Sequence, residues 1–102
     1  MPYRVDFKKS AGKALAKLPA KDQRAIKEVI DALQVDPKPL GYIQLKGYAD
    51  EEPIFRVVCD NYRILYTIKE AFLTVLVVAV GLRADVYTKF AQLMHPDQRG
   101  GR

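Results

Sequence analysis

The chain has very few of the residues that form cross-links and metal sites. Its 102 residues include one cysteine and one histidine. Cys59 cannot form an internal disulfide, which agrees with a reducing compartment, and its place in a strand pattern predicts a small core residue. His95 lies near the end of the chain, where we expect exposure to solvent. Acidic residues 50–52 are consecutive and cannot converge on Mg2+, so the sequence predicts no metal and no cofactor.

Long hydrophobic runs are also absent. The most apolar stretch, residues 72–80, is nine residues long and rich in β-branched side chains, so it predicts a buried strand and not a membrane helix. Residues 1–7 lack the apolar core of a secretory signal. We therefore expect a cytoplasmic protein with no membrane partner.

The composition is that of an ordinary folded domain. Hydrophobic residues make up 49% of the chain and charged residues 28%, and a chain of this length holds one hydrophobic core. We expect a single domain over residues 1–95 and a flexible tail over 96–102.

Positive charge is concentrated near the N-terminus. The net charge is +5, and residues 1–30 carry eight Lys/Arg against three Asp/Glu, whereas residues 31–60 carry three against six. This asymmetry indicates either a polyanionic or acidic protein partner, or a lysine-rich helix face that is simply solvated.

The hydrophobic period changes along the chain from 3.6 residues to 2. Residues 3–7 alternate as a half-buried strand, a helix capped by Ser10 is expected to end at Pro19, and a second helix is expected over residues 20–34. After the break at 36–41 the pattern predicts strands at 42–46, 54–59, 62–68 and 72–80, and a short helix at 84–93. This order predicts an α+β domain: an N-terminal strand, a two-helix hairpin packed on one sheet face, an antiparallel β-meander and a short C-terminal helix.

Two arginines are expected on one face of a hairpin. A two-residue turn at Asp60–Asn61 pairs Cys59 with Tyr62 and Arg56 with Leu65. One face then carries Phe55, Val57, Cys59, Tyr62, Ile64 and Tyr66, and the other carries Arg56, Val58, Arg63 and Leu65. The two arginines lie diagonally across the pair, within reach of one phosphate-sized anion. Alternatively, both extend into water or pair with Glu51, Glu52 or Asp60.

A third arginine and a tyrosine follow the apolar strand at 72–80. Arg83 and Tyr87 are four residues apart and point the same way if the chain turns helical after Gly81. Because Gly81 interrupts the strand alternation, the register does not decide whether they reach the face of Arg56 and Arg63.

Five runs of the sequence resemble the RelE/ParE superfamily of type II toxins, and specifically its RelE-like branch. They are YRVDF (3–7), KLP (17–19), LKG (45–47), FRVVCDNYRILY (55–66) and VGLRADVY (80–87). The resemblance covers about residues 3–90. It implies the RelE-like fold of a strand, a helical hairpin and an antiparallel sheet.

The resemblance also implies an activity and partners. RelE-like members are mRNA interferases, endoribonucleases that cut mRNA in the ribosomal A site, and a cognate antitoxin holds them inactive. The family positions that correspond to Arg56, Arg63, Arg83 and Tyr87 are all filled here by the expected residue types. One position departs from the pattern, because Val58 stands where the best-studied branch has a second lysine.

Metal-free RNA cleavage would use these side chains as follows. The 2'-hydroxyl attacks the adjacent phosphate, so the enzyme supplies a base, a stabiliser of the leaving oxygen and cations. Tyr87 is the candidate base and Arg83 the candidate stabiliser, while Arg56 and Arg63 would hold the scissile phosphate. Lys46 could contact the RNA backbone or be a solvated lysine.

Two other functions remain open at this stage. ParE-like members share the fold and inhibit DNA gyrase without cutting RNA. The chain could also be a degenerate toxin that only binds its antitoxin, for which Val58 is the best support.

Overall fold

The computed structural model describes residues 2–45, 53–83 and 85–87. Within these ranges the secondary structure follows the predicted order. The elements are β1 (Arg4–Phe7), α1 (Lys9–Ala16), α2 (Ala20–Val35), β2 (Ile43–Leu45), β3 (Ile54–Cys59), β4 (Tyr62–Lys69), the 3-10 helix η1 (Glu70–Phe72) and β5 (Thr74–Leu82). Lys46, His95 and the tail at 96–102 lie outside the described residues.

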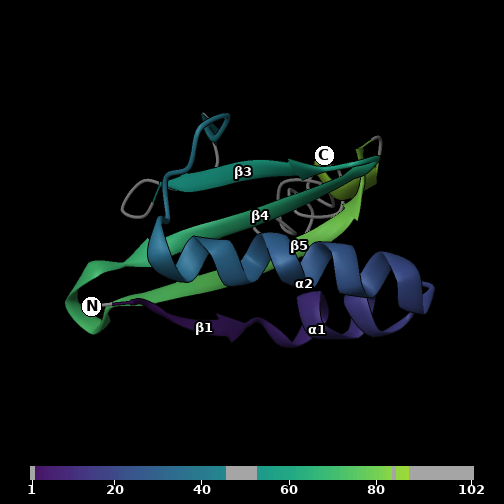
Figure 1. The fold of residues 1–102 in the computed structure, drawn as a ribbon, viewed down its shortest axis with the longest axis horizontal. Helices are drawn as coiled ribbons and strands as arrows, with labels where there is room; N and C mark the ends of the chain where they lie inside the picture. Colours follow the sequence, from purple (N-terminus) through teal and green to yellow (C-terminus); the bar gives the residue numbers. More distant parts are fainter. Residues whose placement is uncertain (1, 46–52, 84, 88–102) are drawn as a thin grey trace, which may run out of the picture.

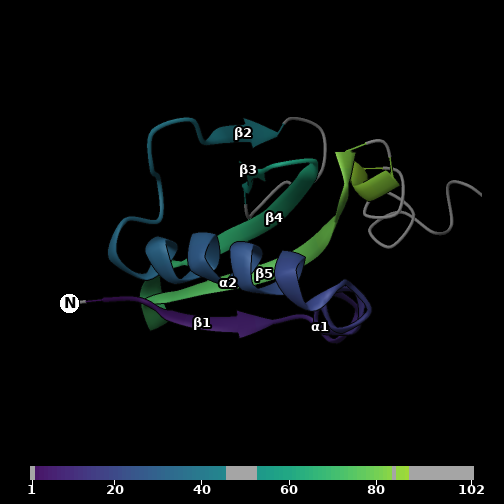
Figure 2. The ribbon, with the colours of Figure 1, turned by 45° about the vertical axis from the view of Figure 1, so that its right-hand side comes forward.

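The five strands form one mixed sheet in the order β1-β5-β4-β3-β2. The meander from β2 to β5 is antiparallel, as predicted, and β1 pairs with β5 in parallel. A parallel neighbour requires a crossover connection, and the helical hairpin provides it. Figures 1 and 2 show α1 and α2 on one side of the sheet, which confirms the predicted α+β arrangement.

Two predicted boundaries were wrong. Ser10 does not cap α1, because Lys8 is the extended residue that precedes the helix and no side chain caps it. The Lys8 amide donates to the carbonyl of Val77 (2.8 Å), so the helix begins directly after the last pairing with β5. At the other end of the chain, β5 begins at Thr74 and not at Phe72, since Phe72 belongs to η1 and Leu73 adopts a left-handed conformation (φ 47°).

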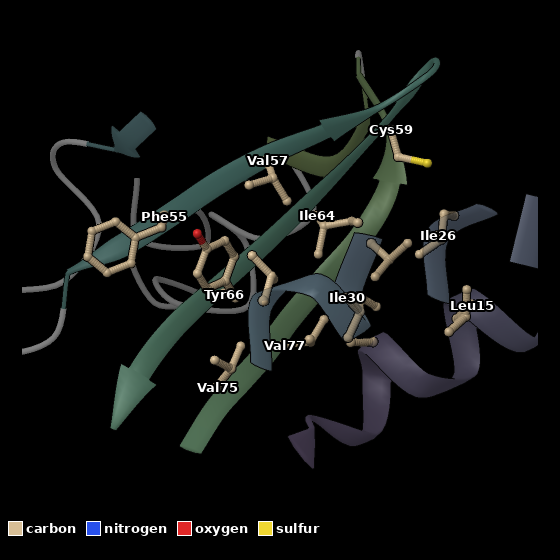
Figure 3. Packing of buried hydrophobic residues seen from close by; sticks show 13 residues of the cluster. Leu15, Ile26, Ile30, Phe55, Val57, Cys59, Ile64, Tyr66, Val75 and Val77 are labelled. Atoms are coloured by element: carbon tan, nitrogen blue, oxygen red, sulfur yellow. The ribbon is translucent and has the colours of Figure 1, made fainter. Parts of the chain in front are cut away.

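The main core lies between the helices and the sheet (Figure 3). The amphipathic stripes of α1 and α2 face the apolar side of β3, β4 and β5, as the 3.6 and 2 periods predicted. Its buried members are Ala11, Leu15, Ile26, Ile30, Leu33, Phe55, Val57, Cys59, Ile64, Tyr66, Val75, Val77 and Val80. The predicted core position of Cys59 is thus confirmed, and its burial raises the pKa of the thiol.

A second, smaller cluster covers the opposite face of the sheet. Ile54, Leu65, Val78, Ala79 and Val86 are buried in it. A bulge between Leu65 and Tyr66 shifts the register of β4 against β5. The strands are therefore covered on both faces. No helix among the described residues is long and apolar enough to cross a membrane.

Tyr66 ties the core to the loop before β2. Its ring is fully buried, and its hydroxyl donates to the carbonyl of Pro37 at 2.6 Å. Burial raises the pKa of this phenol, because the charged form would lose its hydration. The stability contributed by the neutral phenol is therefore complete below the unfolded-state pKa, about 10, and is lost as the pH rises toward the higher folded-state pKa.

We expect Tyr66→Phe to lower the free energy of unfolding by about 1 kcal/mol at pH 7, the usual effect of losing one hydrogen bond. Above about pH 10 the wild-type advantage should shrink, because only the wild type has this phenol to ionise on unfolding. Urea unfolding between pH 7 and pH 11 measures both effects. Parallel curves for the two proteins would contradict the assignment.

Candidate functional site

The hairpin of β3 and β4 has the predicted register. Cys59 pairs with Tyr62, Val58 with Arg63 and Arg56 with Leu65. The two-residue turn is confirmed by the left-handed conformation of Asp60 (φ 54°). Arg56 and Arg63 therefore share the sheet face that α1 and α2 do not cover.

The end of the hairpin positions two of the candidate arginines. The Nη1 of Arg63 donates to the backbone carbonyls of Tyr62 (3.1 Å) and Asp60 (3.3 Å). Next to it, the backbone N–H of Arg83 donates to the carbonyl of Asn61 (3.1 Å). The same turn thus anchors both residues, one by its side chain and the other by its backbone, although they are far apart in sequence.

Arg56 leans in the opposite direction, toward the loop before β2. Its Nη2 lies 3.5 Å from the carbonyl of Gly41, and Gly41 has a positive φ of 93° that suits glycine. The Nε of Arg56 is buried without a hydrogen-bond partner among the described residues. Arg56 and Arg63 share a face, but Arg56 contacts the loop before β2 and Arg63 contacts the turn of its own hairpin. Convergence on one phosphate would require their side chains to turn toward each other.

Tyr87 lies on the same face as the two hairpin arginines. Residues 83 and 85–87 are helical, which agrees with the start of the predicted C-terminal helix, whereas residues 84 and 88–93 of that prediction lie outside the described residues. Tyr87 is half-buried and packs against the second cluster, which includes Leu65 and Ile54. Gly81 pairs with Arg63 across the sheet and lies under Val86. The strand register left open whether Arg83 and Tyr87 reach this face, and the packing against the second cluster answers it for Tyr87 alone.

Two of the three alternative acidic partners of the arginines fall outside the described residues. Glu51 and Glu52 belong to 46–52, and Arg63 contacts the backbone carbonyl of Asp60. Carbonyl oxygens orient a guanidinium but do not neutralise its charge. Among the described residues, neither Arg56 nor Arg63 contacts a carboxylate.

Val58 lies between the two hairpin arginines. It is directly opposite Arg63, two residues along β3 from Arg56, and its side chain is 44% exposed. Since the position is open to solvent, a longer side chain fits there without disturbing the core. The missing lysine therefore removes a cation from the centre of the arginine face.

The structure adds a supporting loop that sequence reasoning missed. Residues 36–42 supply the carbonyl for Arg56 and the carbonyl for Tyr66, and Lys38 lies over the ring of Phe55. From the sequence, the prolines and the glycine of this loop predicted only a break between the second helix and the next strand. No group of three or more His, Cys, Asp or Glu side chains that could hold a metal occurs in the described part of the chain.

A family model described as ParE toxin of type II toxin-antitoxin system, parDE, matches residues 5–87. The chain belongs to the RelE/ParE superfamily of type II toxins. The match contains Arg56, Arg63, Arg83 and Tyr87. No curated protein sequence matches this one.

Solved structures place the chain near RelE toxins. It shares 30% identity with a chain of the RelBE2 toxin–antitoxin complex of Mycobacterium tuberculosis, with 83% of this chain and 95% of that one covered (TM-score 0.71). It shares 28% identity with a chain of the archaeal RelE–RelB complex of Pyrococcus horikoshii OT3, with 81% and 97% covered (TM-score 0.69). A free mutant of E. coli RelE, 24% identical with 92% and 99% covered, has the same fold (TM-score 0.69).

We expect Val58→Lys to strengthen binding of a short single-stranded RNA, because it restores a cation between Arg56 and Arg63. Each added phosphate contact should steepen the slope of log affinity against log salt by about 0.7. Fluorescence anisotropy at several salt concentrations measures the slope. Val58→Gln, similar in length and uncharged, is the matched control, and equal slopes for the two variants would contradict this prediction.

Proposed function

We propose that the protein is the toxin of a type II toxin–antitoxin system that cleaves mRNA in the ribosomal A site. The observation that supports this best is that Arg56, Arg63 and Tyr87 share the sheet face that α1 and α2 do not cover, with the backbone of Arg83 anchored at its end. RNA carries one negative charge per phosphate, and a face of arginines held by carbonyls suits it.

In this proposal the 2'-hydroxyl of the RNA attacks the adjacent phosphate. Tyr87 removes the proton from that hydroxyl, Arg83 stabilises the leaving oxygen by hydrogen bonding, and Arg56 and Arg63 bind the phosphate oxygens. A guanidinium keeps its proton at neutral pH, so Arg83 serves better as a hydrogen-bond donor than as an acid. Lys46 would add a contact to the RNA backbone. The scheme uses protein groups alone.

These side chains are weak acid–base catalysts at neutral pH, and this weakness would explain a dependence on the ribosome. Neither tyrosine nor arginine side chains ordinarily titrate near pH 7. Holding the message in an attack geometry can contribute several kcal/mol to the lowering of the barrier, about 7 or more in favourable cases. A ribosome that holds the codon in place would supply this contribution.

The helical hairpin offers a surface for ribosomal RNA. Lys13, Lys17, Lys21, Arg24 and Lys27 are all exposed. Phosphate contacts of such side chains carry no sequence information and provide general affinity. They lie on the helical layer and leave the arginine face open for the message.

A cognate antitoxin is the proposed protein partner. The matched structures from Mycobacterium tuberculosis and Pyrococcus horikoshii are complexes of RelE-type toxins with RelB-type antitoxins. By analogy, we expect a short open reading frame beside this gene to encode a DNA-binding segment followed by an acidic, amphipathic segment.

Tyr87→Phe and Arg83→Ala should each lower mRNA cleavage by about 100-fold or more, because they remove the base and the stabiliser of the leaving oxygen. Mapping of mRNA ends after induction in cells measures this, and the wild type should give growth arrest with codon-phased cuts. The matched controls are Tyr3→Phe, whose side chain packs against the helix-side core, and Arg4→Ala, which pairs with Thr74 at the opposite end of β5 from the Arg63–Gly81 pair.

The same induction separates the alternative functions. The family model carries the ParE name, so gyrase inhibition is a specific second candidate. Arrest with intact messages and inhibited DNA supercoiling would support it and overturn the nuclease. Absence of arrest would support an inactive module that binds only antitoxin.

We also expect binding to vacant ribosomes to fall steeply with salt, because the basic hairpin would release counterions from ribosomal RNA. For six or more phosphate contacts the affinity should drop by about 1000-fold between 50 and 200 mM salt. Sedimentation with ribosomes over this range measures it. Affinity that does not change with salt would argue against the hairpin as a ribosome-binding surface.

A further inference from the structure

Tyr62 joins the turn of the β3–β4 hairpin to the helical layer. Its hydroxyl donates to Oδ2 of Asp22, in the first turn of α2, at 2.7 Å, although the two residues are 40 positions apart. Its backbone carbonyl accepts a hydrogen bond from Nη1 of Arg63 at 3.1 Å. Across the sheet it pairs with Leu82, the residue before Arg83. One residue thus connects α2 with both arginines at this end of the sheet.

The Tyr62–Asp22 hydrogen bond is of a strong kind. A carboxylate accepts the proton of a phenol at a short distance, and the pair is partly buried. Charge-assisted bonds of this type are about twice as strong as neutral ones. The bond raises the pKa of the Tyr62 hydroxyl, because ionisation would bring two negative charges together. The phenol therefore remains a donor at neutral pH.

Asp22 lies on a rigid corner between α1 and α2. The side-chain amide of Gln23 donates to the carbonyls of Leu18 (2.8 Å) and Ala16 (3.2 Å) at the end of α1. One turn further along α2, Ile26 is fully buried in the main core (Figure 3). The carboxylate that accepts the hydrogen bond is therefore fixed to the core.

The hairpin turn that precedes Tyr62 is exposed to solvent. Asp60 and Asn61 form it, and Asp60 has a left-handed backbone (φ 54°). Their carbonyls accept hydrogen bonds from Nη1 of Arg63 (3.3 Å) and from the backbone N–H of Arg83 (3.1 Å). Exposed turns at the end of a sheet open more readily than its centre. A contact that holds this turn against the helical layer therefore limits how far the two arginines can move.

The side chain of Tyr62 lies on the other face of the sheet from the hairpin arginines. It packs against the main core between the helices and the sheet, whereas Arg63 shares the opposite face with Arg56. Tyr62 and Asp22 therefore do not reach an RNA bound on the face of the arginines. Any effect of theirs on cleavage must pass through the backbone of the turn.

We propose that Tyr62 and Asp22 are positioning residues for RNA cleavage. Their hydrogen bond fixes the turn at residues 60–62, whose carbonyls bind the side chain of Arg63 and the backbone of Arg83. The inference rests on the proposed function, because it assigns the residues that place two groups of that site. Catalysis depends steeply on such placement, since a displacement of about 1 Å can lower a rate by about 100-fold.

Tyr62→Phe tests the role, because it removes the hydroxyl and keeps the ring that packs in the core. On ribosomes programmed with a short mRNA, we expect kcat to fall by about tenfold and KM to stay within about twofold of the wild type, since the lost bond changes placement and not RNA contact. The matched control is Tyr3→Phe. The Tyr3 hydroxyl donates to Oε1 of Glu70 at 2.8 Å, a similar bond at the opposite end of β5, and its loss should leave kcat within about twofold.

A double-mutant cycle separates the hydrogen bond from the two side chains. Asp22→Ala should lower kcat as much as Tyr62→Phe, and the two changes together should lower it no further, because both remove the same bond. Asp22→Asn keeps an oxygen acceptor and should retain part of the activity. Thermal melting shows whether each variant is folded at the assay temperature.

Hydrogen exchange provides a second measurement that does not use the nuclease assay. In Tyr62→Phe the amide of Arg83 should exchange about fivefold faster than in the wild type, because its acceptor lies in the loosened turn. The amide of Ile30, in the middle of α2, should exchange at the same rate in both proteins.

Three results would overturn the positioning role. They are a kcat of Tyr62→Phe equal to that of a wild type that cuts mRNA, an equal loss of kcat in Tyr3→Phe, and unchanged exchange at Arg83. The proposed function fails in a different way, when the wild-type toxin arrests growth without cutting mRNA. The role in cleavage then falls with it, and exchange at Arg83 alone decides whether the Tyr62–Asp22 bond holds the turn.

Discussion

The need to bury both faces of β4 and β5 governs this architecture. Ile64 and Val77 are fully shielded by the helices, while Leu65 and Val78 are just as deeply buried on the other side. Strands that are apolar on both faces need two covering layers. The helical hairpin supplies one, and the turn after β5 contributes Val86 to the other. The position of Tyr87 is therefore a consequence of burial, because its turn is held down where Gly81 leaves room.

Among the described residues, backbone carbonyls, and not carboxylates, contact Arg56 and Arg63. Arg63 is bound by the turn at the end of its own hairpin, and Arg56 is directed toward the loop before β2. A carboxylate would fix a guanidinium more tightly but would cancel its charge. A carbonyl fixes its direction and leaves an anion the stronger ligand, as the proposed RNA substrate would require.

Local patterns predicted most of the fold, and non-local contacts account for the rest. The turn at Asp60–Asn61 has strong local preferences, so the hairpin register and the shared face of Arg56 and Arg63 followed from the sequence. The parallel pairing of β1 with β5 depends on residues distant in the chain, and no local hydrophobic period predicts it. For the same reason the sequence did not reveal that Arg56 turns toward Gly41, or that Ser10 is displaced from the cap by the pairing of Lys8 with Val77.

The parallel pairing of β1 with β5 also determines when the sheet can be completed during synthesis of the chain. Arg4 pairs with Thr74 and Phe7 with Val77, so β1 cannot join the sheet until residues 74–77, near the end of the described chain, have been synthesised. Contacts between distant residues form late, because loop closure must precede them. Arg83 and Tyr87 follow β5 in the sequence. The candidate site can therefore assemble only after nearly all of the described chain has been synthesised.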